Sequence, residues 1–327
     1  MVVKTIVMLS LFITPLVFIN LGMVSSSLLL FSLYLISGLG MAGIGMGIMH
    51  DALHGSYSKN KKVNNILGYS INLIGANASI WKIQHNVLHH TYTNIDHADE
   101  DINVPLLLRL SPNQKRYKIH RFQHFYVWFL YGLMTLSWVT IKDFIQIGKF
   151  KKMGFFDKKN EFSIELTKAI VWKLIYYSFA LVLPIIMAPM AWYIVVFAFL
   201  GMHFITGNII TIIFQTAHVM PGSEFPQPNE EGIIANNWTI HQLATTSNYS
   251  PKNKFFSWFV GGLNYQVEHH LFPNICHVHY RKLSRIVSET AKEYGIPYRI
   301  EKTFISAVWS HLMLLRQLGR MELVPVK

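Results

Sequence analysis

Four long apolar stretches alternate with polar segments along the chain, and each is long enough to form a membrane-spanning helix. About 20 apolar residues in a helix cross the roughly 30 Å of hydrocarbon in a bilayer. Two short turns, Ser25–Ser26 and Ala188–Pro189, join the stretches in pairs, so the pattern predicts two tight helical hairpins. The four predicted spans are Ile6–Val24, Ser27–Met49, Ala169–Met187 and Met190–Phe214.

A fifth apolar stretch, Phe122–Ile141, is predicted to lie in the membrane interface rather than to cross the bilayer. It is rich in Trp and Tyr, which are typical of interfacial helices. A further span would also place His50 and His54 on the opposite side of the membrane from His269 and His270. With four spans, all of these histidines share one side.

The composition agrees with a membrane protein. Of the 327 residues, 51% are hydrophobic and 14% are charged, whereas soluble domains carry about 25% charged residues. The net charge is +12, yet a chain this apolar is not a typical nucleic-acid binder, so no nucleic-acid partner is expected. The single cysteine, Cys276, excludes an internal disulfide.

The basic residues indicate which side of the membrane each segment occupies. Neither hairpin turn contains Lys or Arg, whereas the segments 50–168 and 215–327 contain nearly all of them. Because cytoplasmic segments carry the excess of positive charge, both termini and both segments are predicted to be cytosolic. The predicted fold class is therefore an all-α integral membrane protein in one domain, 1–327. It has four transmembrane helices in two hairpins, interfacial helices and a cytosolic helical cap.

Three short clusters, at 50–54, 85–90 and 266–270, contain seven of the sixteen histidines. On an α-helix, residues three or four apart share a face. The sets that can converge on a metal ion in this way are His50 with His54, His85 with His89, and Gln266 with His269 and His270. His90 is then predicted to point to a neighbouring site.

The clusters predict a centre with two metal ions. Imidazole ligands without cysteine suit iron, copper, zinc or nickel, and one zinc ion takes three or four ligands, so seven or eight histidines are too many for one ion. Two carboxylates, Asp51 and Glu268, can be ligands or can hydrogen-bond to ligand histidines. His218 directly follows the fourth span, at the same predicted depth as His50, and is included as a ligand. The other histidines are interpreted as hydrogen-bonded interfacial residues: His97, His120, His124, His203, His241, His277, His279 and His311.

At these clusters the chain resembles the integral-membrane fatty acid desaturases, whose signature is three histidine boxes, two before the central hairpin and one after it. The boxes here are HDALH, HNVLHH and QVEHH. Glutamine at the start of the third box, with the flanking runs Gly262–Tyr265 and Leu271–Pro273, is similar to the front-end class. Further family-like residues are Asn94–Asp96, Asp99–Asp101, Trp238, Gln242, Thr245 and Thr246.

The resemblance implies a membrane fatty acyl desaturase that inserts a cis double bond, using dioxygen and two electrons at a centre of two iron ions. The implied catalytic iron ligands are His50, His54, His85, His89, His90, His218, His269 and His270, with Gln266 binding directly or through water. Asp51 and Glu268 would then support the ligand histidines, and Trp238, Gln242 and Thr246 would contact the substrate. That substrate would be an acyl lipid, an acyl-CoA or an acyl carrier protein.

Many front-end desaturases carry a fused cytochrome b5 domain with an HPGG haem motif, which this sequence lacks. Electrons are therefore expected from a separate protein, such as a ferredoxin or a free cytochrome b5. The basic cytosolic face would attract an acidic carrier, and the same charges would contact the head groups of membrane lipids. The expected location is a bacterial inner membrane, with the active site on the cytosolic side.

Three other functions use similar residues. A lipid, alkane or carotenoid hydroxylase shares the histidine boxes, and a hydroxylated product without a new olefin would identify it. A haem carrier with two axial histidines needs single histidines that face each other from separate helices. A transporter with a histidine relay needs ionisable residues in the middle of the membrane, where only His203 is predicted to lie.

Overall fold

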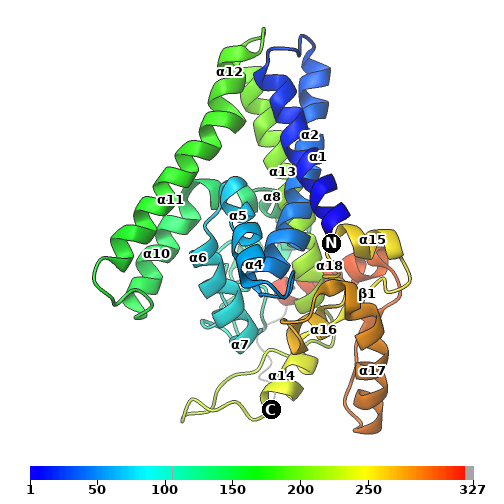
Figure 1. The fold of residues 1–327 in the computed structure, drawn as a ribbon. Coiled ribbons are helices and arrows are strands. Elements are labelled where there is room, and N and C mark those ends of the chain that lie inside the picture. The colour runs from blue at the N-terminus through cyan, green and yellow to red at the C-terminus, as the bar shows by residue number, and fades with distance from the viewer. Residues whose placement is uncertain (105, 321–327) are drawn as a thin grey trace. The chain divides into compact units, whose positions relative to one another are not determined.

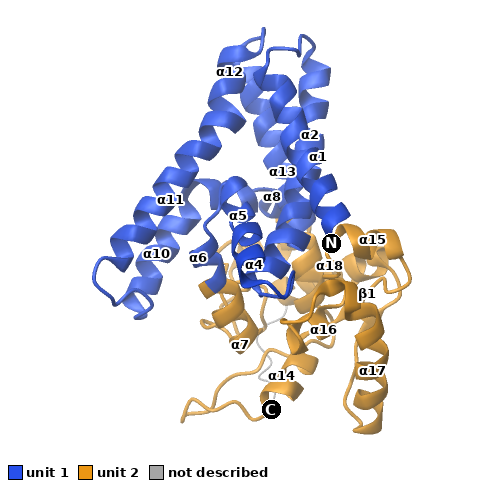
Figure 2. Ribbon diagram, in the orientation of Figure 1, with its two compact units in different colours: residues 1–82, 130–211 blue, residues 83–129, 212–327 orange. Residues whose placement is uncertain are grey.

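The computed structural model describes residues 1–104 and 106–320, which are mostly helical (Figure 1). The chain divides into two compact units (Figure 2). Unit 1 comprises Met1–Lys82 and Leu130–Thr211, and unit 2 comprises Ile83–Phe129 and Ile212–Lys327. The predicted all-α fold class is thereby confirmed for the described residues.

Four helical rods in the described chain are long and apolar enough to cross a membrane, so the protein is a multi-pass membrane protein, as predicted. Two of them are the single helices α1 (Val2–Asn20) and α13 (Trp192–His218). Each of the other two contains a π-helical turn. These rods are α2 (Ser27–Gly43), η1 (Ile44–Ile48) and α3 (Met49–Leu53), and α11 (Glu161–Tyr177), η5 (Ser178–Val182) and α12 (Leu183–Met187).

The observed rods differ from the predicted spans at their ends. The first helix ends at Asn20, before the predicted Val24, and Gly22 adopts a left-handed backbone with a φ of +69°. Glycine adopts this conformation without steric cost, and it turns the chain out of the helix. The second and fourth rods continue to Leu53 and His218, so the first histidine box and His218 lie at helix ends.

The remaining elements are short. Those of unit 1 are α4 (Lys61–Gly68), α5 (Ser70–Leu73), α6 (Ala78–Trp81), α9 (Met134–Ser137), the π-helix η4 (Trp138–Lys142) and α10 (Asp143–Lys152). The helices that lie wholly or mostly in unit 2 are η2 (Lys82–His89), α7 (His90–Tyr92), η3 (Lys118–Phe122), α8 (Gln123–Gly132), α14 (Trp238–Thr245), α15 (Lys254–Phe259), α16 (Gln266–Leu271), η6 (His277–His279), α17 (Tyr280–Glu293) and α18 (Phe304–Arg320). The strands β1 (Asn248–Tyr249) and β2 (Ile300–Glu301) form a parallel pair in which Asn248 lies opposite Ile300.

The fifth apolar stretch forms a bent pair of helices instead of one straight helix. Lys118–Gly132 and Met134–Lys152 are bent by 50° relative to each other. A broken span and a re-entrant loop have this shape, and so does a segment that follows the membrane surface. The predicted interfacial placement therefore stays a prediction.

Close backbone contact holds the first hairpin of unit 1 together. A Cβ atom at Gly40 would lie 2.4 Å from the backbone nitrogen of Phe12, so only glycine allows α1 and α2 to approach this closely. The Ser37 hydroxyl donates a hydrogen bond of 2.7 Å to the Phe12 carbonyl. Such bonds satisfy polar groups where lipid offers no hydrogen-bond partner.

Polar side chains inside the spans of unit 1 are also paired. The Lys173 ammonium lies 2.7 Å from the Asp143 carboxylate and donates to the Gly75 carbonyl at 3.0 Å. Nε2 of His203 lies 2.7 Å from the Tyr176 hydroxyl. This contact agrees with the interpretation of His203 as a hydrogen-bonded residue, because its ring is engaged by a neighbouring helix.

The predicted orientation can be tested by cysteine labelling. In a Cys276→Ser background, Ser26→Cys and Pro189→Cys should react with a membrane-impermeant maleimide outside intact spheroplasts, because both positions are exposed in turns between spans. Glu289→Cys, at an exposed position of α17, should react only after permeabilisation. Labelling of Glu289→Cys in intact spheroplasts would contradict the predicted orientation.

Candidate metal centre

The second of the three histidine boxes, residues 85–90, lies in unit 2, on the π-helix η2 and the first residue of α7. A π-helix bonds each residue to one five positions away, so residues five apart share a face. Accordingly, Nε2 of His85 lies 3.3 Å from Nε2 of His90. The α-helical spacing predicts the pair His85 and His89, and these rings do stack, with centroids 5.2 Å apart. The π-helix additionally brings His90 next to His85.

His89 belongs to a first group of three imidazoles, which come from three separate elements. The group consists of His89 on η2, His218 at the end of α13 and His270 on α16, and one nitrogen of each lies within 4.8 Å of the others. All three rings are buried, and none of their Nε2 atoms has a hydrogen-bond partner among the described residues. Buried polar atoms without partners are costly, and a bound cation would satisfy all three.

The opposite nitrogen, Nδ1, of each ring does have an acceptor. The three contacts are His89 to the Asp99 carboxylate at 3.0 Å, His270 to Oε1 of Gln242 at 2.7 Å, and His218 to the Thr245 carbonyl at 3.4 Å. An acceptor at Nδ1 keeps the proton there and leaves the lone pair on Nε2. Once Nε2 is deprotonated, as metal binding requires, the three rings would present lone pairs to a common point.

A second group of imidazoles adjoins the first. Nε2 of His90 lies 3.3 Å from Nε2 of His85 and 3.0 Å from Nε2 of His269. Nitrogens bound to one ion at about 2.0–2.1 Å lie about 3 Å apart, which matches this spacing. The two groups are contiguous, because the rings of His90 and His270 stack with their centroids 4.4 Å apart. This all-imidazole set is compatible with a metal site of the kind that iron occupies.

Asp99 is a supporting residue to which the sequence pattern assigned no role. Burial lowers the pKa of His89, but the charges of Asp99 and Asp101 and the hydrogen bond to Asp99 outweigh it and raise this pKa to about 9. A carboxylate in this position increases the basicity of a ligand imidazole toward metal. Asp99 lies outside the helical spacing of the box, and only the family-like run Asp99–Asp101 pointed to it.

Gln266 opens the third box and shares one face of α16 with His269 and His270, since it lies three and four residues before them. Its side chain is fully buried, and neither amide atom has a hydrogen-bond partner among the described residues. A buried amide without partners is unusual and suits a group that binds an ion or an ordered water. This observation supports the predicted role of Gln266 without testing it.

Glu268 holds the third box in place from behind. Its carboxylate accepts hydrogen bonds from the Asn248 amide at 2.7 Å and from the Tyr298 hydroxyl at 2.8 Å. Burial raises the pKa of Glu268 to about 7, although both hydrogen bonds oppose the shift. Asn248 also accepts from the backbone nitrogen of Val267 at 3.0 Å, so β1 fixes the start of α16.

The first box lies in unit 1, at the end of the second rod. The His50 and His54 rings have centroids 4.8 Å apart, and both contact the Trp81 ring, at 5.5 Å and 5.9 Å. The backbone N–H of His54 donates a hydrogen bond of 3.1 Å to the backbone carbonyl of His50. The two residues therefore lie one helical turn apart on one face, as predicted. Asp51 lies with its carboxylate 3.9 Å from Nδ1 of His50.

The residues predicted to contact substrate support the second box. The Trp238 indole and the Gln242 amide both donate to the His90 carbonyl, at 3.2 Å and 3.1 Å. The Thr246 hydroxyl donates to the Gln242 carbonyl at 2.6 Å. These bonds give Trp238 and Gln242 a positioning role, and contact with substrate stays a prediction.

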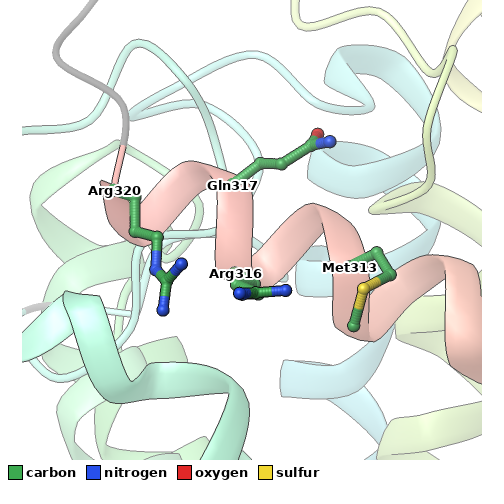
Figure 3. Close-up of a pocket in the computed structure, with 4 residues that line it drawn as sticks. All are labelled: Met313, Arg316, Gln317 and Arg320. Carbon is green, nitrogen blue, oxygen red and sulfur yellow. The ribbon is translucent and has the colours of Figure 1, made fainter.

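Figure 3 shows a pocket of about 360 Å³ on α18, away from the predicted ligands in sequence. Its lining residues are Met313, Arg316, Gln317 and Arg320. Because none of them belongs to the histidine groups, the pocket does not define the candidate metal centre.

The sequence model of the fatty acid desaturase family matches residues 25–302, a range that contains all three boxes and His218. The chain belongs to the fatty acid desaturase family. It is 35% identical over 290 residues to the sn-1 linoleoyl-lipid 6-desaturase of a Synechocystis species, an alignment that covers 88% of this chain and 79% of that protein. It is 34% identical over 287 residues to the enzyme of the same name from Arthrospira platensis, covering 87% and 77%. It is 36% identical over 308 residues to the acyl-lipid (8-3)-desaturase of Physcomitrium patens, covering 91% and 62%.

This desaturase is accordingly an oxidoreductase that acts on fatty acyl chains. Fatty acyl desaturation also accounts for the paired imidazoles, whereas a haem carrier needs single histidines facing each other from separate helices. A transporter relay finds no support in His203, whose ring is engaged by Tyr176.

The ligand assignment in the first group can be tested by metal analysis. His89→Ala should lower bound iron and abolish activity while the protein still inserts, because one converging nitrogen is lost. Asp99→Asn should weaken metal affinity about 10–100-fold, since it removes the charge behind the ring. Iron is measured per chain by plasma mass spectrometry. The control is His97→Asn, because His97 is exposed and its φ of +66° suits asparagine. Wild-type iron content in His89→Ala would refute the assignment.

Asn94 joins the segments that carry these ligands. Its left-handed backbone, with a φ of +60°, directs its N–H to Asp99 at 2.9 Å. Its side-chain amide donates to the carbonyls of His218 and Glu224 at 3.1 Å and of Thr245 at 3.4 Å. Asn94 therefore fastens the loop of Asp99 to the end of α13.

Asn94→Asp should destabilise this junction, because it keeps the size of the side chain but replaces the amide donor with a carboxylate oxygen, an acceptor that would face three carbonyl oxygens. Buried hydrogen bonds left unmade cost about 1–3 kcal/mol each, so the melting temperature should fall by about 5 °C or more, with reduced iron content. Differential scanning fluorimetry and metal analysis measure both effects. Asn113→Asp is the matched control, since its exposed amide donates only to the Phe225 carbonyl. An Asn94→Asp protein with wild-type melting and iron would exclude this role.

Proposed function

We propose that this desaturase acts on acyl chains of membrane lipids at a centre of two iron ions held by histidine. The observation that carries the proposal is the convergence of six buried imidazoles of unit 2 in two adjoining groups. Three of their Nε2 atoms have no hydrogen-bond partner in the described chain, and their Nδ1 atoms are held by fixed acceptors. Such rings are ready to bind metal without rearrangement.

The proposed ligands are His50, His54, His85, His89, His90, His218, His269 and His270, with Gln266 binding directly or through water. Iron bound there would supply the activation of dioxygen that removal of hydrogen from an unactivated methylene requires. The chain itself holds a proton at Nδ1 of each ring in the first group and keeps the rings buried from water. His50 and His54 complete the ligand set in the order typical of the family, within one domain spanning 1–327.

An acyl lipid is the proposed substrate for two reasons. The relatives from Synechocystis and Physcomitrium are named for linoleoyl-lipid and acyl-lipid substrates. In addition, α11, α12 and α13 expose many large apolar side chains, including Ile186, Trp192 and Phe197, which suits contact with lipid. A substrate that already lies in the bilayer reaches this surface without leaving the membrane.

The remaining partners follow from the reaction. We propose that a separate protein, a ferredoxin or a free cytochrome b5, delivers electrons on the cytosolic side of a bacterial inner membrane. The excess of basic residues in the segments outside the hairpin turns supports both the orientation and an acidic carrier. Acyl-CoA and acyl carrier protein are the alternatives to a lipid substrate.

Expression in a host that makes only simple fatty acids, with linoleate and an electron donor supplied, tests the proposal. Mass spectrometry should find a new cis double bond, first in glycerolipids after a pulse of labelled linoleate, and none with His269→Ala. A hydroxylated chain without a new olefin would overturn desaturation. Label that enters the product first in acyl-CoA would overturn the lipid substrate.

A further inference from the structure

The first two turns of α17 expose a group of basic side chains. Arg281, Lys282 and Arg285 are all exposed, and none of them forms an ion pair among the residues that the structure describes. The first turn contains no acidic residue, and the acidic residues of the helix, Glu289 and Glu293, lie in its second half. This end of α17 is therefore uniformly positive.

Helix stability does not explain this placement. The N-terminus of a helix carries the positive end of its dipole, and cations there are unfavourable by a few tenths of a kcal/mol each. Arg281 and Arg285 are also four residues apart, so they repel each other on one face. A local arrangement that opposes folding preferences is typical of a functional surface.

Two exposed apolar residues flank these basic residues along the sequence. Val278 is 54% exposed and Ile286 is 61% exposed. Together with the three basic residues and His279, they form what we term the α17 patch. A small apolar centre surrounded by charge is the usual composition of a transient protein interface.

The α17 patch lies one side chain away from a proposed metal ligand. Tyr280, the first residue of α17, is buried, and its hydroxyl lies 3.3 Å from Nδ1 of His269. The neighbouring Arg281 is exposed. The α17 patch is thus linked to the second group of imidazoles through Tyr280.

We propose that the α17 patch is the docking surface for an acidic one-electron carrier protein. The inference rests on the proposed function, because conversion of one –CH2–CH2– unit to –CH=CH– consumes O2, two electrons and two protons and releases two water molecules. The carrier is oxidised by one electron at each visit, so it docks twice per turnover. Small, charge-steered interfaces suit such short-lived complexes.

An anionic membrane surface is the competing occupant, and the exposed side chains favour the protein partner. Elsewhere in unit 2, α15 exposes Phe255 and Trp258, and α18 exposes Ile305 and Trp309. Tryptophan with aliphatic neighbours is typical of membrane-interface contact. The α17 patch has no tryptophan, and its charges are concentrated on one short segment.

The experiment compares two triple variants of the full chain in phosphatidylcholine nanodiscs. The test variant is Arg281→Gln/Lys282→Gln/Arg285→Gln. The matched control, Lys152→Gln/Lys158→Gln/Lys159→Gln, removes three exposed charges from unit 1. Turnover is measured with limiting reduced plant-type ferredoxin and, separately, with dithionite and methyl viologen. Binding of oxidised ferredoxin is measured by microscale thermophoresis.

The ratio of ferredoxin-driven to dithionite-driven turnover should fall about tenfold in the test variant at low ionic strength, because steering by the lost charges is removed. Salt should reduce the wild-type ratio toward the variant value. The control variant and Arg281→Lys/Arg285→Lys, which keeps the charge, should both show the wild-type ratio. Equal ratios in the test variant and the wild type would overturn the proposal.

Two further outcomes separate the alternatives. A defect that appears only in nanodiscs with phosphatidylglycerol would assign the α17 patch to lipid and overturn docking of a carrier. Weaker ferredoxin binding by the test variant supports the docking surface even where no olefin forms with either reductant. Absence of olefin in the wild type would contradict the proposed function alone.

Discussion

The candidate metal centre depends on the hydrogen bonds that hold the far side of the imidazole rings in its first group. An imidazole with a free Nδ1 can exchange its proton between two nitrogens and rotate, so it presents a lone pair only part of the time. Asp99, Gln242 and the Thr245 carbonyl remove this freedom from the first group of rings. Each acceptor lies on a different segment from the ring it holds, so the centre and the packing of unit 2 form together.

The acceptors are themselves held, which makes the support rigid. Gln242 accepts from His270 and donates to the His90 carbonyl, and thereby links the second and third boxes. Asn94 does the same for the loop of Asp99 and the end of α13. Residues that hydrogen-bond to ligand histidines in this way fix the orientation of the rings, which the backbone alone leaves free.

The short parallel pair β1–β2 positions residues that hold the third box. Two residues in each strand bury little surface, yet Asn248 of β1 contacts both the backbone of Val267 and the carboxylate of Glu268. Tyr298, close before β2, binds the same carboxylate. The pair therefore brings two distant segments to the back of the third box and fixes its rotation.

The sequence predicted the parts of the fold that periodicity and composition determine. The four apolar rods, the helical pairing of His50 with His54 and the position of His218 close after an apolar span all follow from patterns within one segment. What it could not predict were contacts between distant segments. Glu268 was expected beside ligand histidines but is bonded to Asn248 and Tyr298, and nothing in the spacing of the box distinguishes these cases.

The contact between His85 and His90 in the second box could not be predicted for a related reason. A single extra residue in a helical turn changes which side chains share a face, and local propensity does not reveal it. The end of the first span at Asn20 was likewise set by one backbone angle, at Gly22, inside a run that is otherwise apolar. In both places the hydrophobic pattern is right and the local geometry departs from the regular helix.

The π-helix η2 has a consequence for how the proposed centre would bind metal. A stretch of eight residues in the wider helix is less favourable than the regular α-form, yet it places His85 beside His90. An ion held by both rings would stabilise this wider winding, so metal affinity and the backbone geometry of the second box would be thermodynamically coupled.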